Sequence, residues 1–230
     1  MKIGVTGCSH SSKNYGGQPW WYHMGETLNA EIIDSSSRGG SNEFNIEKVK
    51  FIIDNNPDLD LFVFQLTHPA RIMMGVSHIK SDERGLHSPT NVNGVKYFNF
   101  TTMRNVKAFE SEFSNWYDAE KVLDFIYQQS TISTYNLEYK ILHTILLVFH
   151  ICESYGKKVV FFSWYTDIHE LAKKSGYLEL IKKIPILYGT VADFTKNNNV
   201  PSIPKDSHFG NESQKIIFDN FIYPQLKNLI

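Results

Sequence analysis

The chain has 230 residues, which is enough for one well-buried core. Hydrophobic residues make up 42% of it and charged residues 20%, a composition that is typical of a globular protein and excludes a disordered chain. With 23 basic against 24 acidic residues, the chain has no positive excess to attract nucleic acid or an anionic membrane, so we expect neither as a partner.

Cysteine content and apolar runs exclude further classes. Cys8 and Cys152 are too few and too far apart for a disulfide framework or a cysteine-based zinc site. The N-terminal residues contain one lysine and no long apolar run, so we expect no signal peptide. The longest apolar stretch, residues 141–151, is too short to span a bilayer and is expected to form a buried helix.

Short apolar strands alternate with helices in the first part of the chain. The elements expected there are strand 2–6, helix 19–29, strand 30–34, helix 43–55 and strand 60–66. This rhythm predicts a parallel sheet with right-handed crossovers. Because ligands of such sheets bind beyond the carboxyl ends of the strands, we expect loops 7–18, 35–42 and 67–71 to meet at one edge.

The rest of the chain is expected to add an insertion, one more strand and several helices. Residues 68–105 are expected to be an irregular insertion over the site, in the position of a lid, with a hairpin at Asn93-Gly94. The elements expected after it are helices 106–128 and 135–155, strand 158–164, a broken helical region 167–196 with Pro185 and Gly189 as interruptions, and helix 211–226. We see no linker or repeat and expect one domain, residues 1–230, with a three-layer α/β/α fold around a mostly parallel sheet.

The first segment with candidate catalytic residues is Gly7-Cys8-Ser9-His10-Ser11, directly after the first strand. A serine in this position has its hydroxyl at the carboxyl edge of the sheet, and its own N–H can face a developing oxyanion. An ordinary polar loop between a strand and a helix has the same composition, so the segment does not by itself identify a nucleophile.

Two later segments carry the remaining candidates. Gly39 and Gly40 follow the second strand, where a residue without a side chain lets a substrate approach a backbone N–H closely. The same segment also reads as a tight turn before a helix that Ser41 or Asn42 caps, and both roles can hold at once.

Asp206 and His208 precede the last helix. There a histidine can act as a general base for a serine, and a nearby carboxylate can orient its ring. The alternative is a capped helix start with a solvent-facing histidine.

The order of these segments resembles the SGNH (GDSL-like) hydrolase family. The first block of that family, usually Gly-Asp-Ser-x-Ser, corresponds to residues 7–11. The second block is a glycine, for which Gly39 is the better match and Gly40 its neighbour. The last block, an aspartate and a histidine, corresponds to Asp206 and His208. The resemblance covers most of the chain and implies an SGNH/flavodoxin-like fold and a serine esterase or O-deacetylase that works through an acyl-enzyme, without metal or cofactor.

The resemblance also implies a role for each matching residue. Ser9 is the expected nucleophile, His208 its base and Asp206 the group that orients the base. The oxyanion hole is expected from the N–H groups of Ser9 and of Gly39 or Gly40, together with a third donor. The expected substrate is a small acyl ester or an O-acetylated carbohydrate.

Three departures from the family pattern change this picture. Cys8 replaces the aspartate of the first block, which supports the loop and does not react. The Gly-x-Asn-Asp of the third block is absent, and the chain reads Thr67-His68-Pro69-Ala70-Arg71 instead. Asp206 lies only two positions before His208, which leaves open a Ser–His dyad that a backbone carbonyl supports.

Thr67, His68 and Arg71 are the candidates to replace the missing asparagine, and the sequence does not choose among them. We place Thr67 with the oxyanion hole and expect His10, Asn42, His68 and Arg71 to contact substrate or support the site. The third segment loosely resembles family members from bacteriophage and environmental sequences. Since we expect no signal peptide and no transmembrane segment, a cytoplasmic or virion-associated protein is expected.

Two other functions stay open at this stage. The first is a binding or structural protein that keeps the fold without activity, which the altered third block and the short Asp–His spacing favour. The second is a metal-dependent hydrolase built from His10, His68 and His208 with Asp206. Against the metal site, the sequence has no HExxH and no tight His-x-His.

Overall fold

The structure is a computed structural model. It describes residues 1–13, 17–37, 40–69, 71–76, 90–92, 95–101, 134–204 and 208–230, and in 71–76, 90–92, 95–101 and 134–138 it describes the backbone only.

A five-stranded parallel sheet forms the centre of the molecule. Its strands, in spatial order, are β2 (Glu31–Asp34), β1 (Lys2–Thr6), β3 (Leu61–Leu66), β7 (Lys158–Ser163) and β8 (Ile186–Thr190). Every pairing is parallel. Counted along the chain, the order is 2-1-3-4-5, the flavodoxin-like arrangement, and it reverses direction between β1 and β3. The predicted parallel sheet is thus confirmed.

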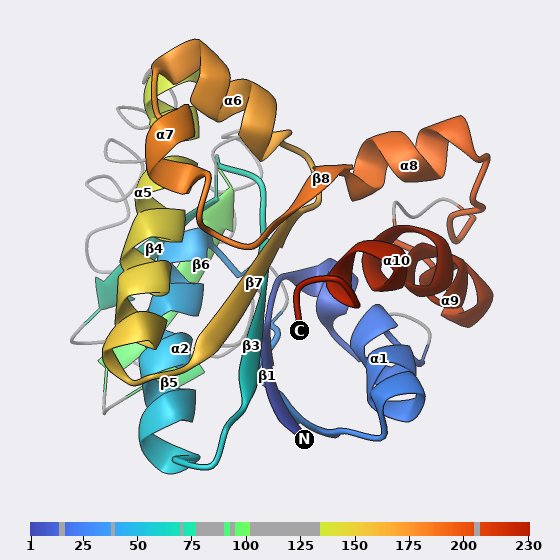
Figure 1. Cartoon of the computed structure of the whole chain (residues 1–230), viewed down its shortest axis with the longest axis horizontal. Coiled ribbons are helices and arrows are strands. Elements are labelled where there is room, and N and C mark those ends of the chain that lie inside the picture. The colour runs from blue at the N-terminus through green and yellow to red at the C-terminus, as the bar shows by residue number, and fades with distance from the viewer. Residues whose placement is uncertain are drawn as a thin grey trace, which may run out of the picture.

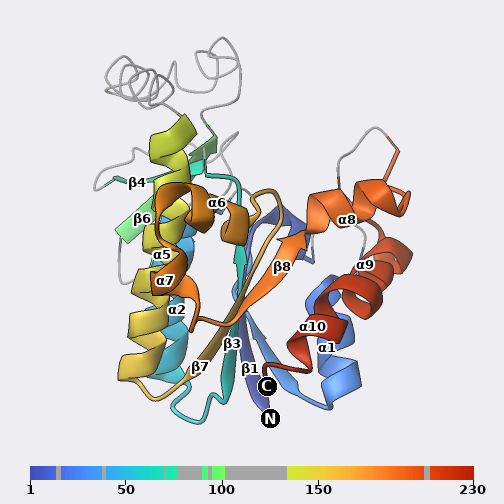
Figure 2. The same ribbon diagram turned by 45° about the horizontal axis from the view of Figure 1, so that its top comes forward.

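Helices cover both faces of this sheet (Figure 1). One face carries α2 (Asn42–Asn55), α5 (Thr134–Ser154), α6 (Ile168–Ser175) and α7 (Leu178–Ile181). The other carries α1 (Trp20–Leu28), α8 (Val191–Asn197), α9 (Asn211–Ile217) and α10 (Tyr223–Leu226), with a π-helical segment, η2 (Phe218–Ile222), between the last two. The second view shows the same three layers, as the predicted α/β/α fold requires (Figure 2).

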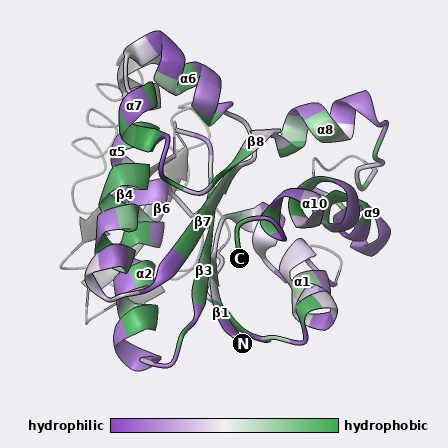
Figure 3. Ribbon diagram, viewed as in Figure 1, coloured by the Kyte–Doolittle hydropathy of each residue, from purple (hydrophilic) through white to green (hydrophobic). Residues whose placement is uncertain are grey.

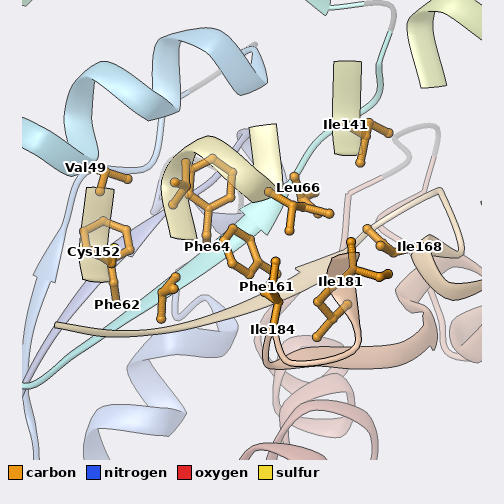
Figure 4. Close-up of a cluster of buried hydrophobic side chains, with 14 of the residues drawn as sticks. Val49, Phe62, Phe64, Leu66, Ile141, Cys152, Phe161, Ile168, Ile181 and Ile184 are labelled. Carbon is orange, nitrogen blue, oxygen red and sulfur yellow. The ribbon is translucent and has the colours of Figure 1, made fainter. Parts of the chain in front are cut away.

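The alternation of side chains along the strands produces two cores. In β3 every residue is buried, because each face of the strand meets a layer of helices. Phe62 and Phe64 pack with α2 and α5 (Figure 4), whereas Leu61 and Val63 pack with the helices of the opposite face. This burial on both sides accounts for the almost continuous hydrophobic character of β3 and β7 (Figure 3).

The insertion after β3 contains a second sheet that the sequence analysis did not predict. β4 (Arg71–Val76), β6 (Val95–Thr101) and β5 (Thr90–Val92) pair antiparallel, and β4 packs against α2. Within it, Val92 pairs with Val95, as the predicted hairpin at Asn93-Gly94 requires. The turn itself and the expected helix 106–128 lie outside the described residues.

One predicted element is wrong. The region 167–196 was expected to be helical and broken, but it contains the edge strand β8 between α7 and α8. Gly189 does not interrupt a helix there; it lies inside this strand with a φ of 73°. Among the described helices, none is both long and apolar enough to cross a membrane.

Candidate active site

Ser9 lies at the carboxyl edge of the central sheet. It begins a short 3-10 helix, η1 (Ser9–Ser11), just after β1. The turn is closed by the N–H groups of Ser11 and Ser12, which donate to the carbonyl oxygens of Cys8 (2.9 Å) and Ser9 (3.2 Å). Ser9 is 6% exposed. The loop therefore holds this hydroxyl at the edge where substrates of parallel sheets bind.

A buried amide from β3 fixes the shape of this loop. Gln65 Oε1 accepts hydrogen bonds from the Cys8 N–H (3.1 Å) and from Ser11 Oγ (2.7 Å), while its Nε2 donates to the carbonyl of Leu66 (3.1 Å). A Cβ on Gly7 would lie 2.5 Å from Gln65 Oε1, so a side chain at that position would displace the amide. Gln65 thus positions the residues on both sides of Ser9.

Two indole rings tie the same loop to α1. Trp20 Nε1 donates to Ser11 Oγ (2.7 Å), and Trp21 Nε1 donates to the Ser11 carbonyl (2.6 Å). Both indoles are buried, so these bonds are shielded from water. The loop is held by the sheet on one side and by the first helix on the other.

The glycine loop after β2 packs on the start of the nucleophile loop. The Ser37 N–H donates to the Gly7 carbonyl (3.1 Å), and the Gly40 N–H donates to the Ser37 carbonyl (3.2 Å). A Cβ on Gly40 would lie 3.0 Å from Ser37 Oγ and 3.3 Å from the Gly7 carbonyl oxygen. Gly40 is therefore packed closely against this loop, while Gly39 lies outside the described residues, and the predicted approach of a substrate to either glycine stays a prediction.

A buried lysine supports the glycine loop from α2. Lys48 Nζ donates to the Ser35 carbonyl, and Ser35 in turn binds the Val5 carbonyl through its N–H and its Oγ. Burial lowers the pKa of Lys48 to about 8, and the nearby Asp34 opposes this shift. Burial in turn raises the pKa of Asp34. The loop is therefore supported by a buried lysine whose charged form is disfavoured by burial.

Asn42 and Thr67 join the second and third loops. Asn42 Oδ1 accepts from the Thr67 N–H (2.9 Å), and Asn42 Nδ2 donates to the Thr67 carbonyl (3.3 Å). Ser41 is the N-cap of α2, since its hydroxyl accepts from the Phe44 N–H. The Thr67 side-chain oxygen is buried, and it has no hydrogen-bond partner among the described residues.

His208 comes to the same edge from the other end of the chain. Its ring is half-buried and lies 4.8 Å, centroid to centroid, from the ring of His10. His10 stacks face to face on Trp164 at 4.1 Å, and its Nε2 is 2.8 Å from Tyr165 Oη. Because His10 directly follows Ser9, this contact brings the first and last blocks together.

The final helical segment reinforces that junction. Gln214, in α9, donates from Nε2 to the His10 carbonyl (3.1 Å) and accepts at Oε1 from the Trp20 N–H (3.2 Å). Nearby, Asn211 Oδ1 accepts from the Gln18 N–H (2.7 Å). The helix that follows His208 is therefore bonded directly to the loop that carries Ser9.

The remaining site residues are placed only in part. The His68 ring meets Tyr165 edge-on at 5.6 Å. Asp206 lies outside the described residues, as does the side chain of Arg71, so their predicted roles stay predictions. Where side chains are described, His, Cys, Asp and Glu form no group of three able to hold a metal ion.

Sequence reasoning missed Gln65, Gln214 and Tyr165. The one signal for Gln65 was a polar residue inside the apolar run Leu61–Leu66, since a buried amide in a strand needs partners. Gln214 and Tyr165 gave no such signal, because their partners are distant in the sequence.

Comparisons with known proteins support the fold. No protein-family model matches the sequence, and no curated protein sequence is significantly similar to it.

Among solved structures, the crystal structure of TesA matches with a TM-score of 0.55 and 12% identity, covering 100% of both chains. The psychrotrophic esterase EstA from Pseudoalteromonas sp., inhibited by monoethylphosphonate, matches with a TM-score of 0.54 and 9% identity over 99% of this chain and 97% of its own. An acetyl xylan esterase, AlAXEase, gives a TM-score of 0.44 at 11% identity over 100% of both chains. At these identities the first two matches establish a shared fold: this chain has the α/β architecture of TesA and EstA.

Proposed function

We propose that the protein is a serine-dependent carboxylic-ester hydrolase with Ser9 as nucleophile and His208 as general base. The observation that carries this proposal is the contact between the His208 ring and His10, the residue that follows Ser9, at the carboxyl edge of the sheet. The shared fold with the esterase EstA supports it.

The proposed reaction has two halves. Ser9 Oγ attacks the ester carbonyl carbon while His208 takes the hydroxyl proton. The tetrahedral intermediate then collapses to an acyl-enzyme, and His208 gives the proton to the departing alcohol. Water attacks the acyl-enzyme with His208 again as base, which releases the carboxylic acid and restores Ser9.

The oxyanion is proposed to bind the Ser9 N–H, the Gly39 N–H and the Thr67 hydroxyl. Gly39 is preferred to Gly40 because the Gly40 N–H already donates to the Ser37 carbonyl. Thr67 is preferred as the third donor because its hydroxyl is buried and unbonded among the described residues, and a buried hydroxyl without a partner is costly unless a ligand uses it. Asp206 is proposed to orient His208.

A fluorophosphonate probe tests the nucleophile. We expect it to label the wild-type protein and the Ser12→Ala control, and not Ser9→Ala. Hydrolysis of short-chain acyl esters should disappear in both Ser9→Ala and His208→Ala. Equal labelling of Ser9→Ala would contradict the assignment, whereas glycan binding without any turnover would favour a binding protein that keeps the fold.

A further inference from the structure

His10 directly follows the proposed nucleophile, and its imidazole contacts two other rings of the site. It stacks face to face on Trp164, with ring centroids 4.1 Å apart and an interplanar angle of 10°. It also meets the ring of His208 at 4.8 Å with an angle of 34°, which is a tilted stack and not a perpendicular contact. The ring of the proposed base therefore packs on a ring that belongs to the nucleophile loop.

The His10 ring is itself held on several sides. His10 is 3% exposed and Trp164 is 1% exposed, so the stack between them is shielded from water. His10 Nε2 lies 2.8 Å from Tyr165 Oη, and the His10 carbonyl accepts from Gln214. A flat ring that is stacked on one face and bonded at one nitrogen has little freedom to rotate about its side-chain bonds. His10 thus gives His208 a rigid neighbour.

The segment that carries His208 packs on the same two rings. Phe209, the next residue, lies 6.3 Å from the His10 ring and 6.0 Å from the Trp164 ring, centroid to centroid. The His208 carbonyl accepts from the Ile203 N–H at 2.8 Å. These contacts fix the main chain around His208, so the orientation of its imidazole depends on what the ring itself meets.

A histidine that acts as a general base needs its ring oriented in two respects. A hydrogen bond at one ring nitrogen fixes the tautomer and the direction of that edge of the ring. A contact over the face of the ring fixes its plane, and with it the line along which the other nitrogen approaches a hydroxyl. Asp206 has the first role in the proposed reaction, whereas the second role requires a rigid group beside the ring.

We propose that His10 is a positioning residue for the general base: its ring, backed by Trp164, sets the plane of the His208 imidazole. This rests on the proposed esterase function and adds to it the group that aligns the base. His10 exchanges no proton in this role, so another flat ring can replace it.

The test replaces His10 with and without a flat ring and measures kcat/KM for two esters of one short-chain acid. n-Butanol is a poor leaving group that needs a proton from His208, whereas p-nitrophenolate leaves without one. His10→Leu should lower kcat/KM about 100-fold for the n-butyl ester and about 10-fold for the p-nitrophenyl ester, since misplaced acid–base groups have effects of this order. His10→Phe keeps a ring that can stack, so both values should stay within about threefold of the wild type.

His169→Leu is the matched control. His169, in α6, is also an imidazole stacked on an aromatic ring at 4.1 Å, but its partner is Tyr188 in β8, which β3 and β7 separate from β1. Its loss removes a similar ring pair from another part of the molecule and should leave both esters at wild-type rates. Circular dichroism gives the folded fraction of each variant, by which the rates are corrected.

The outcomes separate this inference from the function on which it rests. Absence of wild-type turnover on both esters, or turnover that survives Ser9→Ala, overturns the esterase function itself. Turnover that requires Ser9, together with wild-type rates in His10→Leu or equal losses on the two esters, overturns only the role of His10. A loss in His10→Phe as large as that in His10→Leu does the same, because the imidazole nitrogens and not the ring plane would then be needed. His10→Met, which also lacks a flat ring, decides the matter if His10→Leu does not fold.

Discussion

Asn42 and Thr67 bind each other through two hydrogen bonds that join the first turn of α2 to the end of β3. The side-chain amide of Asn42 forms hydrogen bonds with both the N–H and the carbonyl of Thr67. These backbone groups therefore need no bond to the Thr67 hydroxyl. The Thr67 hydroxyl has no hydrogen-bond partner among the described residues, which suits its proposed role as third oxyanion donor.

Replacement of Thr67 by valine tests whether the Thr67 hydroxyl acts as an oxyanion donor. Thr67→Val keeps the shape and the bonds to Asn42 but removes the hydroxyl, and loss of one oxyanion donor should lower kcat by about 10²–10³-fold. The free energy of unfolding should stay level or rise, because a buried hydroxyl that lacks a partner among the described residues is removed. Steady-state kinetics and urea unfolding measure the two effects.

Thr6→Val is the matched control for that experiment. The Thr6 hydroxyl is also buried and unbonded among the described residues, but it lies within β1. Its removal should affect stability in the same direction and leave kcat unchanged. Identical kcat values for Thr67→Val and Thr6→Val would exclude Thr67 as a donor.

Gln214→Met should impair catalysis through the position of Ser9. The change keeps the volume but leaves the His10 carbonyl and the Trp20 N–H without the bonds they now make. We expect kcat to fall about 10- to 100-fold with KM little changed, since small misplacements of reacting groups have effects of that order. Gln225→Met removes comparable bonds to the backbone of Tyr188 in β8, which β3 and β7 separate from β1 in the sheet, so it should lower stability and spare kcat. A kcat loss of equal size in both variants would argue against a positioning role.

Gly7→Ala should damage the nucleophile loop by steric conflict. The new Cβ would lie 2.5 Å from Gln65 Oε1 and 2.6 Å from Ser11 Oγ, so we expect a loss of about 1–3 kcal/mol of stability together with most of the activity. Gly4→Ala would also collide, at 2.7 Å from the Phe62 ring, but within the core. Activity for each folded molecule, with the folded fraction measured by circular dichroism, should fall only in Gly7→Ala.

Lys48 should make stability depend on pH in the alkaline range. Its folded-state pKa of about 8 is below the ordinary 10.5, so between these values the unfolded chain binds more protons. Stability should therefore rise with pH across this window, by up to about 3 kcal/mol for a shift of this size. Guanidinium unfolding at pH 8 and pH 10.5 should show this rise in the wild type and not in Lys48→Met. Parallel pH dependence in the two proteins would contradict the role of burial at Lys48.

The sequence predicted the central elements because buried elements have an apolar local composition. Leu61–Leu66 is apolar throughout because both of its faces are covered, and α2 begins at the serine cap that its sequence indicates. β8 escaped prediction because it is a short edge strand with Tyr188 exposed and with a shifted register against β7. Its identity as a strand depends on a neighbour, not on its own residues.

The candidate site likewise contains residues that the local sequence indicates and residues that it does not indicate. Ser9 and His208 could be proposed because serine and histidine are recognisable chemistry at recognisable positions. Gln65 and Gln214 could not, because each binds backbone groups or a side chain from segments far away in the sequence. Residues that hold a site are defined by the folded arrangement, whereas residues that react are defined by their functional groups.

The bond from Gln214 to the His10 carbonyl has a consequence for how the protein matures. Synthesis proceeds from the N-terminus, so the nucleophile loop leaves the ribosome early while the helix that anchors it is made among the later segments. A nascent chain that has not reached residue 208 carries Ser9 without either His208 or the Gln214 anchor. The proposed hydrolytic site is therefore completed only late in translation.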